Sequence, residues 1–172
     1  HSFQPGGEAW CMGPDRIGAY LVEARSIKER YLREGRHTRI YVGLELDIYG
    51  KPEEGLDYVI GSAHGFWSDA DGRIFNVDES PEVLRFIRDE LFSGDPYLMT
   101  DAYYDQVARI PEATGCDIIG HFDLVTKFNE RYPMLDVRSP RYLRRALEVM
   151  SYLVEKDSIF EINTGAMSRG WR

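Results

Sequence analysis

The stretch Leu56-Asp57-Tyr58-Val59-Ile60-Gly61-Ser62-Ala63-His64 decides the fold that this sequence predicts. It opens with the apolar run of a buried β-strand and passes through small residues to a histidine. Three more stretches share this organisation, each being an apolar run that leads to ionisable or polar residues: 39–45, 116–121 and 158–163. Because helical patterns separate these runs, the sequence predicts an α/β fold with parallel strands in a sheet or a barrel.

The helices between these strands are marked by their apolar period and by the residues at their ends. From Pro14 to Gly35 the apolar residues recur about every 3.6 positions, with proline suited to the first turn and glycine to the end. Ser80-Pro81 and Ser139-Pro140 each place an N-cap serine before a proline at the first helical position. A further helix is expected over residues 97–113.

Two finer expectations concern the segments 65–79 and 140–154. We expect the first to be irregular, because its residues 68–73 (SDADGR) have the composition of a turn. In the second, we expect five apolar residues to form the buried face of the helix: Leu143, Ala146, Leu147, Met150 and Val154.

Length and composition narrow the classes of protein. The 172 residues suffice for one domain with a sizeable core but are fewer than the roughly 250 of a complete β/α barrel. The net charge of −8 argues against a broad surface for nucleic acid or anionic membranes. No apolar run approaches the roughly 20 residues of a membrane span, and no signal peptide is visible. The 2 cysteines do not predict a disulfide scaffold, so we expect a reduced, cytoplasmic protein.

Glu45, His64 and His121 are the strongest candidates for chemistry. Each lies at the end of an apolar run, and the carboxyl ends of parallel strands meet on one face. A lone histidine is more often a hydrogen-bonded structural residue than a ligand, but two at equivalent positions favour a metal site. Glu45 adds an anionic oxygen that divalent ions favour. The alternative interpretation of Glu45 is a carboxylate at a strand end that forms a salt bridge. Because a set of two histidines and one glutamate with an open position can activate water, we predict that all three are catalytic metal ligands.

Residues close to these positions give weaker signals. Asp47 and Asp123 lie two positions after the first and the last of the three ligands, where a carboxylate either orients an imidazole or caps the following loop. Lys127, Arg169 and Arg172 are candidates for binding a phosphate group of a substrate. The alternative for these three cations is ordinary solvated surface charge.

Several motifs together carry a resemblance to a known family. The first is Gly61-Ser62-Ala63-His64, followed by residues 120–128 (GHFDLVTKF) and 161–166 (EINTGA). Residues 43–47 (GLELD) fit the same pattern, and residues 71–80 resemble an insertion found in one branch of that family. In this order and with these spacings, the sequence resembles the PHP-type histidinol-phosphatases over essentially the whole chain.

The resemblance implies a fold and a set of metal ligands. The fold would be a distorted (β/α)7 PHP barrel, of which this chain covers the central part, with up to three divalent ions (Zn, Mn or Fe) at the strand ends. Glu45 would bridge two ions, His64 and His121 would complete the ligands of one, and His1 would bind another. The family's opening His-x-His and closing Asp-x-His motifs are absent from the sequence. We therefore expect residues 1–172 to form a single PHP-like domain that is truncated at both ends.

The resemblance also implies a function, with two alternatives. The expected reaction is metal-dependent phosphomonoester hydrolysis, converting L-histidinol phosphate to L-histidinol in histidine biosynthesis. The alternatives are another PHP phosphoesterase and a non-catalytic metal-binding module. The expected partner is a small phosphorylated substrate, rather than nucleic acid or a membrane, and the sequence leaves the oligomeric state open.

Overall fold

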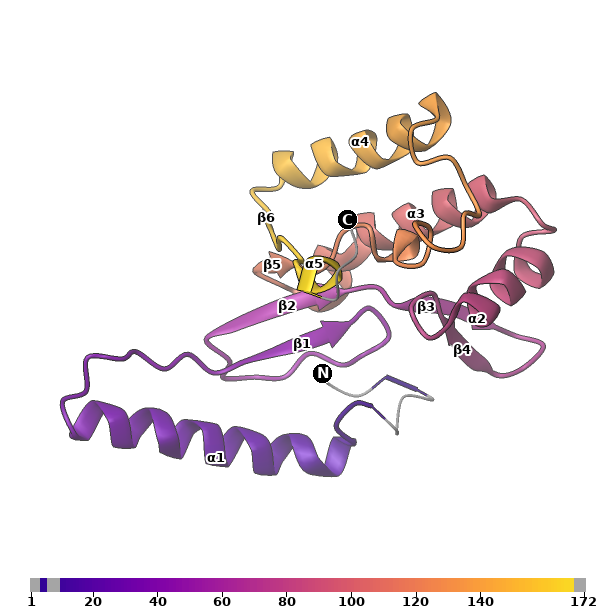
Figure 1. The fold of residues 1–172 in the computed structure, drawn as a ribbon. Coiled ribbons are helices and arrows are strands. Elements are labelled where there is room, and N and C mark those ends of the chain that lie inside the picture. The colour runs from indigo at the N-terminus through magenta and orange to yellow at the C-terminus, as the bar shows by residue number, and fades with distance from the viewer. Residues whose placement is uncertain (1–3, 6–9, 169–172) are drawn as a thin grey trace.

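The computed structural model describes residues 4–5 and 10–168, and Figure 1 shows its arrangement of helices around a small sheet. The elements in chain order are α1 (Pro14–Arg33), β1 (Gly43–Asp47), β2 (Tyr58–Ser62), β3 (Gly65–Ser68), β4 (Arg73–Asn76), α2 (Pro81–Phe86), the π-helical turn η1 (Ile87–Leu91), α3 (Pro96–Thr114), β5 (Ile118–Ile119), the 3-10 turn η2 (Leu124–Thr126), α4 (Pro140–Glu155), β6 (Ile159–Phe160) and α5 (Gly165–Ser168).

The main sheet has four parallel strands in the order β1-β2-β5-β6, which is also their order along the chain. The register pairs Glu45 with Ile60, Ile60 with Ile118, and Ile118 with Ile159. Because all four strands are parallel, their carboxyl ends lie along one edge. The predicted α/β fold with parallel strands is thus confirmed, whereas the closed barrel stays a prediction.

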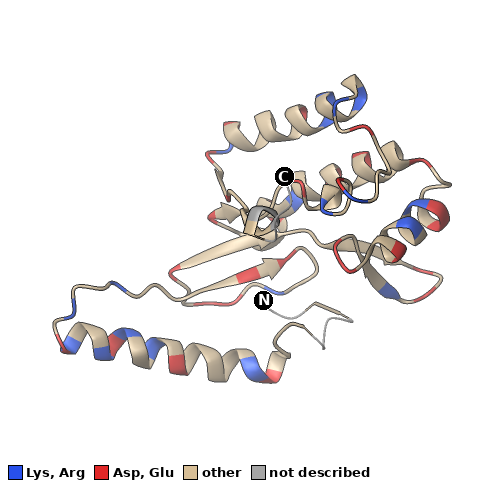
Figure 2. Ribbon diagram, viewed as in Figure 1, with Lys and Arg blue, Asp and Glu red and all other residues tan. Residues whose placement is uncertain are grey.

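Helix α3 forms the centre of the main core. It packs against β2 and α4, and its Tyr103, Val107 and Ile110 are at most 1% exposed. Ile119 of β5 and Leu153 of α4 belong to the same cluster. Figure 2 shows that charged residues lie mainly on helices and loops, whereas the strands of the main sheet carry few of them. The main sheet and α3 therefore form the base from which the loops at the carboxyl edge extend.

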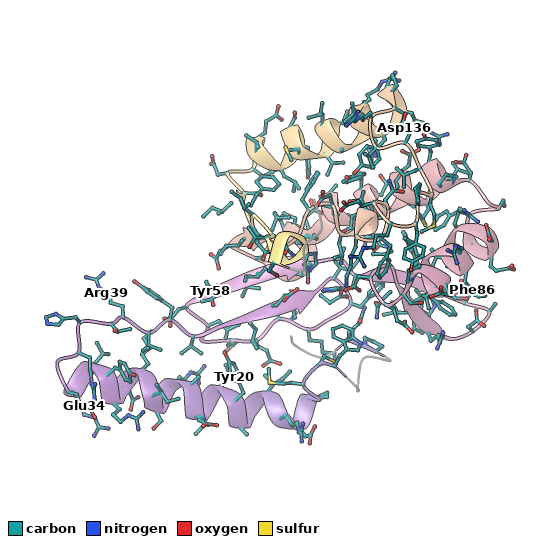
Figure 3. The ribbon with its side chains drawn as sticks, viewed as in Figure 1. Tyr20, Glu34, Arg39, Tyr58, Phe86 and Asp136 are labelled. Atoms are coloured by element: carbon teal, nitrogen blue, oxygen red, sulfur yellow. The ribbon has the colours of Figure 1, made fainter. Side chains whose placement is uncertain are left out.

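Helix α1 has a second, smaller cluster of its own. Its Ile17 and Leu21 pack with Val42 and Leu44 at the β1 side of the sheet. Figure 3 shows Tyr20 between α1 and β1, where its hydroxyl donates a hydrogen bond to the Gly43 carbonyl oxygen at 2.8 Å. These contacts fix β1 between the helix and β2.

The helix starts follow the predicted caps. Ser80 Oγ accepts a hydrogen bond from the Val83 backbone N–H at 3.2 Å, and Ser139 Oγ accepts one from the Tyr142 backbone N–H at 3.3 Å.

In the described part of the chain, no helix combines the length and the apolar composition that crossing a membrane requires.

The expectation of an irregular segment over residues 65–79 is wrong for its first part. Strands β3 and β4 form an antiparallel hairpin that begins directly after His64. Its turn contains Gly72 at φ 63°, so the predicted turn chemistry closes a hairpin instead of a loose loop. Phe66, Ile74 and Phe75 anchor the hairpin in the core.

The predicted buried face of α4 is also wrong in part. Tyr142, Val149 and Leu153 face the core, and Ala146 is half-buried beside them. Four residues of the predicted face are exposed by 37–58%: Leu143, Leu147, Met150 and Val154. The reason is that apolar residues cover more than half of this helix's circumference, so periodicity alone does not decide which part contacts α3.

Candidate metal centre

The carboxyl edge of the sheet brings together Glu45, His64 and His121. Glu45 lies in β1, His64 follows β2 by two positions, and His121 follows β5 by two. One ligand atom from each side chain lies within 4.8 Å of the others. The predicted convergence of these side chains is therefore present, and their role as metal ligands stays a prediction.

Each histidine is held in place by a hydrogen bond to its backbone. The His64 carbonyl oxygen accepts from the Val77 N–H at 2.7 Å, which ties His64 to the end of the hairpin. The His121 N–H donates to Glu161 Oε2 at 2.8 Å, just after β6. The sequence analysis did not assign this role to Glu161, although its position at the end of a strand was the available signal.

The three side chains face one point. Glu45 Oε1 lies 3.2 Å from His121 Nε2 and 3.5 Å from His64 Nε2. The two imidazole rings meet edge to face, with centroids 4.8 Å apart and planes at 71°. Two Nε2 atoms and one carboxylate oxygen thus surround a common position, as the ligands of a single ion do.

Asp47 contacts His64 at the ring nitrogen that faces away from Glu45. Its Oδ2 lies 2.8 Å from His64 Nδ1, and its Oδ1 accepts a hydrogen bond from the Tyr49 N–H at 2.9 Å. Asp47 is 3% exposed and His64 is 4% exposed. Each of the two roles considered for Asp47, orienting an imidazole and capping the next loop, has a matching contact in the structure.

The charges of the group depend on one another. Burial by itself raises the pKa of Glu45, but hydrogen bonds and attraction from His121 and His64 outweigh burial and lower the pKa to about 2. Burial by itself lowers the pKa of His64, whereas hydrogen bonds to Asp47 and Glu45 raise the pKa to about 9. Without a metal, Glu45 is therefore ionised and His64 protonated at neutral pH, so a cation competes with that proton.

The surroundings of the two histidines differ. The Nδ1 atom of His121 is buried and has no hydrogen-bond partner among residues 4–5 and 10–168.

The Trp10 ring contacts His64, with centroids 5.7 Å apart, and is 41% exposed. Trp10 therefore forms a wall of the site that is open to solvent on its other side.

Of the remaining predicted site residues, the structure describes Lys127 and Asp123, and neither belongs to this group. Lys127 Nζ donates to the Asp78 carboxylate at 3.0 Å and to its carbonyl oxygen at 2.9 Å, so its substrate-binding role stays a prediction. Asp123 is exposed, and its side chain makes no hydrogen bond to any described residue. His1, Arg169 and Arg172 lie outside the described residues.

The donor set fits a divalent metal ion. Two neutral imidazole nitrogens and one carboxylate oxygen suit Zn, Mn or Fe, and one such atom from each side chain lies within 4.8 Å of the others. Glu45, His64 and His121 would hold the ion, and Asp47 would support His64 from its other ring nitrogen.

Comparison with known proteins agrees with a phosphatase relationship. A protein of Schizosaccharomyces pombe described as "Probable histidinol-phosphatase" is 28% identical over 168 residues, covering 89% of this chain and 50% of that protein. The chain thus spans about half the length of the curated relative it matches. No family model matches the chain. The similarity supports a histidinol-phosphatase-like relationship for this segment.

Proposed function

We propose that this chain carries a metal centre of a metal-dependent phosphomonoester hydrolase whose substrate is L-histidinol phosphate. The observation that carries the proposal is the convergence of Glu45, His64 and His121 within 4.8 Å at the carboxyl edge of a parallel sheet. The similarity to a relative described as a probable histidinol-phosphatase supports the substrate. The complete fold in this proposal is the (β/α)7 barrel, to which the four parallel strands would contribute.

The residues of the site have distinct tasks in this reaction. A divalent ion, when bound, supplies Lewis-acid activation of water and neutralises charge on the phosphate. Glu45 brings the negative charge that attracts the ion, and the two imidazoles bring neutral nitrogen donors. Arg169 and Arg172 would bind phosphate oxygens through their planar guanidinium groups. His1 would contribute to a second ion, since phosphoryl hydrolysis commonly uses paired ions about 3.5–4 Å apart.

The proposed partner is a small phosphorylated molecule. The net charge of −8 disfavours an extended nucleic-acid surface, and Figure 2 shows acidic and basic residues interspersed along α1. One observation favours a second candidate, a non-catalytic metal-binding module: the described residues contain a single group of metal-ligating side chains. Another PHP-type phosphoesterase activity is the remaining alternative.

Phosphate release tests the proposal. The protein is loaded with Zn²⁺, Mn²⁺ or Fe²⁺ and assayed with L-histidinol phosphate, both as the 172-residue chain and within any longer polypeptide that contains it. We expect hydrolysis to depend on added metal and to be lost in Glu45→Gln. The matched control is Glu23→Gln, an exposed residue of α1, which should keep full activity. Metal binding without hydrolysis of any phosphomonoester would favour the non-catalytic module.

A further inference from the structure

We propose that Asp47 is the positioning residue of the metal centre, which orients His64 for metal binding and thereby sets the affinity of the site for its ion. The inference rests on the proposed metal centre and goes beyond it by assigning a role to a residue that touches neither ion nor substrate. It starts from one contact, the 2.8 Å distance between Asp47 Oδ2 and His64 Nδ1.

An imidazole presents only one lone pair to a metal, and the partner of its other nitrogen decides which one. With the proton of His64 held on Nδ1 by Asp47, the lone pair of a neutral ring belongs to Nε2. Nε2 is the atom that lies 3.5 Å from Glu45 Oε1. The hydrogen bond therefore selects the tautomer that the proposed metal centre requires.

The carboxylate of Asp47 is itself fixed. Its other oxygen accepts from the Tyr49 N–H at 2.9 Å, which restricts rotation of the carboxylate, and the side chain is only 3% exposed to solvent. A charge-assisted hydrogen bond in such a buried place is strong. Ser62 Oγ also approaches His64 Nδ1, but at 3.5 Å it makes at most a weak bond.

Among the described residues, none holds the ring of His121 in the way that Asp47 holds the ring of His64. The Nδ1 atom of His121 is buried with no hydrogen-bond partner in the described part of the chain, and the backbone of His121 rather than its ring is held by Glu161. His64 is thus the ligand that is oriented before an ion arrives. Losing such an orienting partner typically lowers metal affinity by about 10–100-fold.

Calorimetric titration with Zn²⁺ tests the role of Asp47. We expect the zinc affinity to be lowered by about 10–100-fold in Asp47→Ala and by less in Asp47→Asn, whose amide oxygen still accepts from Nδ1–H. Ser62→Ala should change the affinity by less than about threefold, since its bond is weak. The matched control is Asp123→Asn, an exposed carboxylate two positions after a ligand, which should bind as the wild type does.

A spectroscopic measurement on the wild-type chain tests the tautomer of His64 directly. The sequence has 4 histidines, so selective ¹⁵N labelling resolves their ring signals. In the zinc-loaded chain, His64 should show ¹⁵N coupling to a slowly exchanging Nδ1 proton, and that protection should disappear in Asp47→Ala. A fast-exchanging His64 Nδ1 proton, or a His64 bound through Nδ1, would overturn the inference.

The titrations also separate this inference from the proposed function. If Glu45→Gln loses zinc while both Asp47 variants keep wild-type affinity, Asp47 is not the positioning residue and the metal centre stands. If the wild-type chain binds no zinc, or if Glu45→Gln binds it unchanged, the metal centre and the inference both fail.

Discussion

Glu45 Oε1 lies 3.2 Å from Nε2 of His121, although 76 positions separate the two residues in the chain. Between them, His64 completes a group whose three members come from three consecutive strands of the main sheet. An ion bound here would join β1, β2 and β5 at their carboxyl ends, so metal binding and folding are coupled.

The first prediction concerns metal removal. Zinc should raise the melting temperature, because an ion that binds the folded chain alone stabilises it by about 2.7 kcal/mol at 100 times its Kd. A chelator should reverse the shift. Differential scanning calorimetry should show no zinc effect for Glu45→Gln and a normal effect for Glu23→Gln. A zinc shift that survives in Glu45→Gln would mean that the ion binds elsewhere.

The second prediction concerns the pH dependence of stability without metal. The pKa of His64 is raised from 6.5 to about 9, so its stabilising contribution is complete below pH 6.5 and is lost as the pH rises through 9. The pKa of Glu45 is lowered from 4.5 to about 2, so its contribution is complete above pH 4.5 and is lost as the pH falls through 2. Urea unfolding in the presence of a chelator should therefore show both contributions in full between pH 4.5 and 6.5.

A variant isolates the alkaline part of that profile. In His64→Gln, the loss of stability between pH 6.5 and 9 should shrink relative to the wild type, because the titrating ring is gone. If the wild type and His64→Gln lose the same free energy of unfolding over this range, the raised pKa of His64 does not contribute to the pH dependence of stability.

The third prediction concerns the close approach of α3 to β2 at Gly61. A Cβ atom there would lie 2.6 Å from Thr114 Oγ1 and 2.7 Å from Cys116 Sγ, and would also contact Ile110. Gly61→Ala should lower the free energy of unfolding by about 1–3 kcal/mol through overpacking. The matched control is Gly18→Ala inside α1, where nothing lies within 4 Å; it should raise the free energy of unfolding by about 0.5–1 kcal/mol. Urea denaturation of both variants measures these changes, and equal changes in the free energy of unfolding would contradict the prediction.

The fourth prediction concerns the phosphate. Arg169→Ala and Arg172→Ala, tested in metal-loaded active protein, should reduce kcat/KM for histidinol phosphate by about 100-fold or more for whichever arginine binds it, with metal content unchanged. Arg33→Ala, at the end of α1, is the control and should keep its kinetics. Near-normal kinetics in both the Arg169→Ala and the Arg172→Ala variant would exclude these arginines from substrate binding.

Much of this site could be predicted because it depends on short-range rules. A proline after a serine marks a helix start, and Ser80 and Ser139 do cap α2 and α4. An apolar run that ends in a histidine places that histidine at the carboxyl end of a strand, and parallel strands bring such ends together. These two rules were sufficient to bring Glu45, His64 and His121 to one place.

The rest depended on choices that the sequence leaves open. The turn residues of 68–73 are equally compatible with a loop and with the β3–β4 hairpin, because both need the same turn chemistry. The face that α4 buries depends on what α3 presents to it. The bond from the His121 N–H to Glu161 spans 40 positions, and the strand-end position of Glu161 does not by itself indicate which residue it contacts. Asp47 could orient His64 or cap a loop, and only the fold shows that its two oxygens do both.

The order of the strands in the main sheet has a consequence for how the chain folds during synthesis. Since β1, β2, β5 and β6 are neighbours in the same order in which they are made, each new strand can pair with an edge that already exists. Once residues up to Val77 have emerged, β1, β2 and the hairpin can place His64 over Asp47. His121 arrives later with β5. A nascent chain halted between these two points would hold an oriented imidazole and lack one of the two histidines, so the set of three ligands would be completed only when β5 is made.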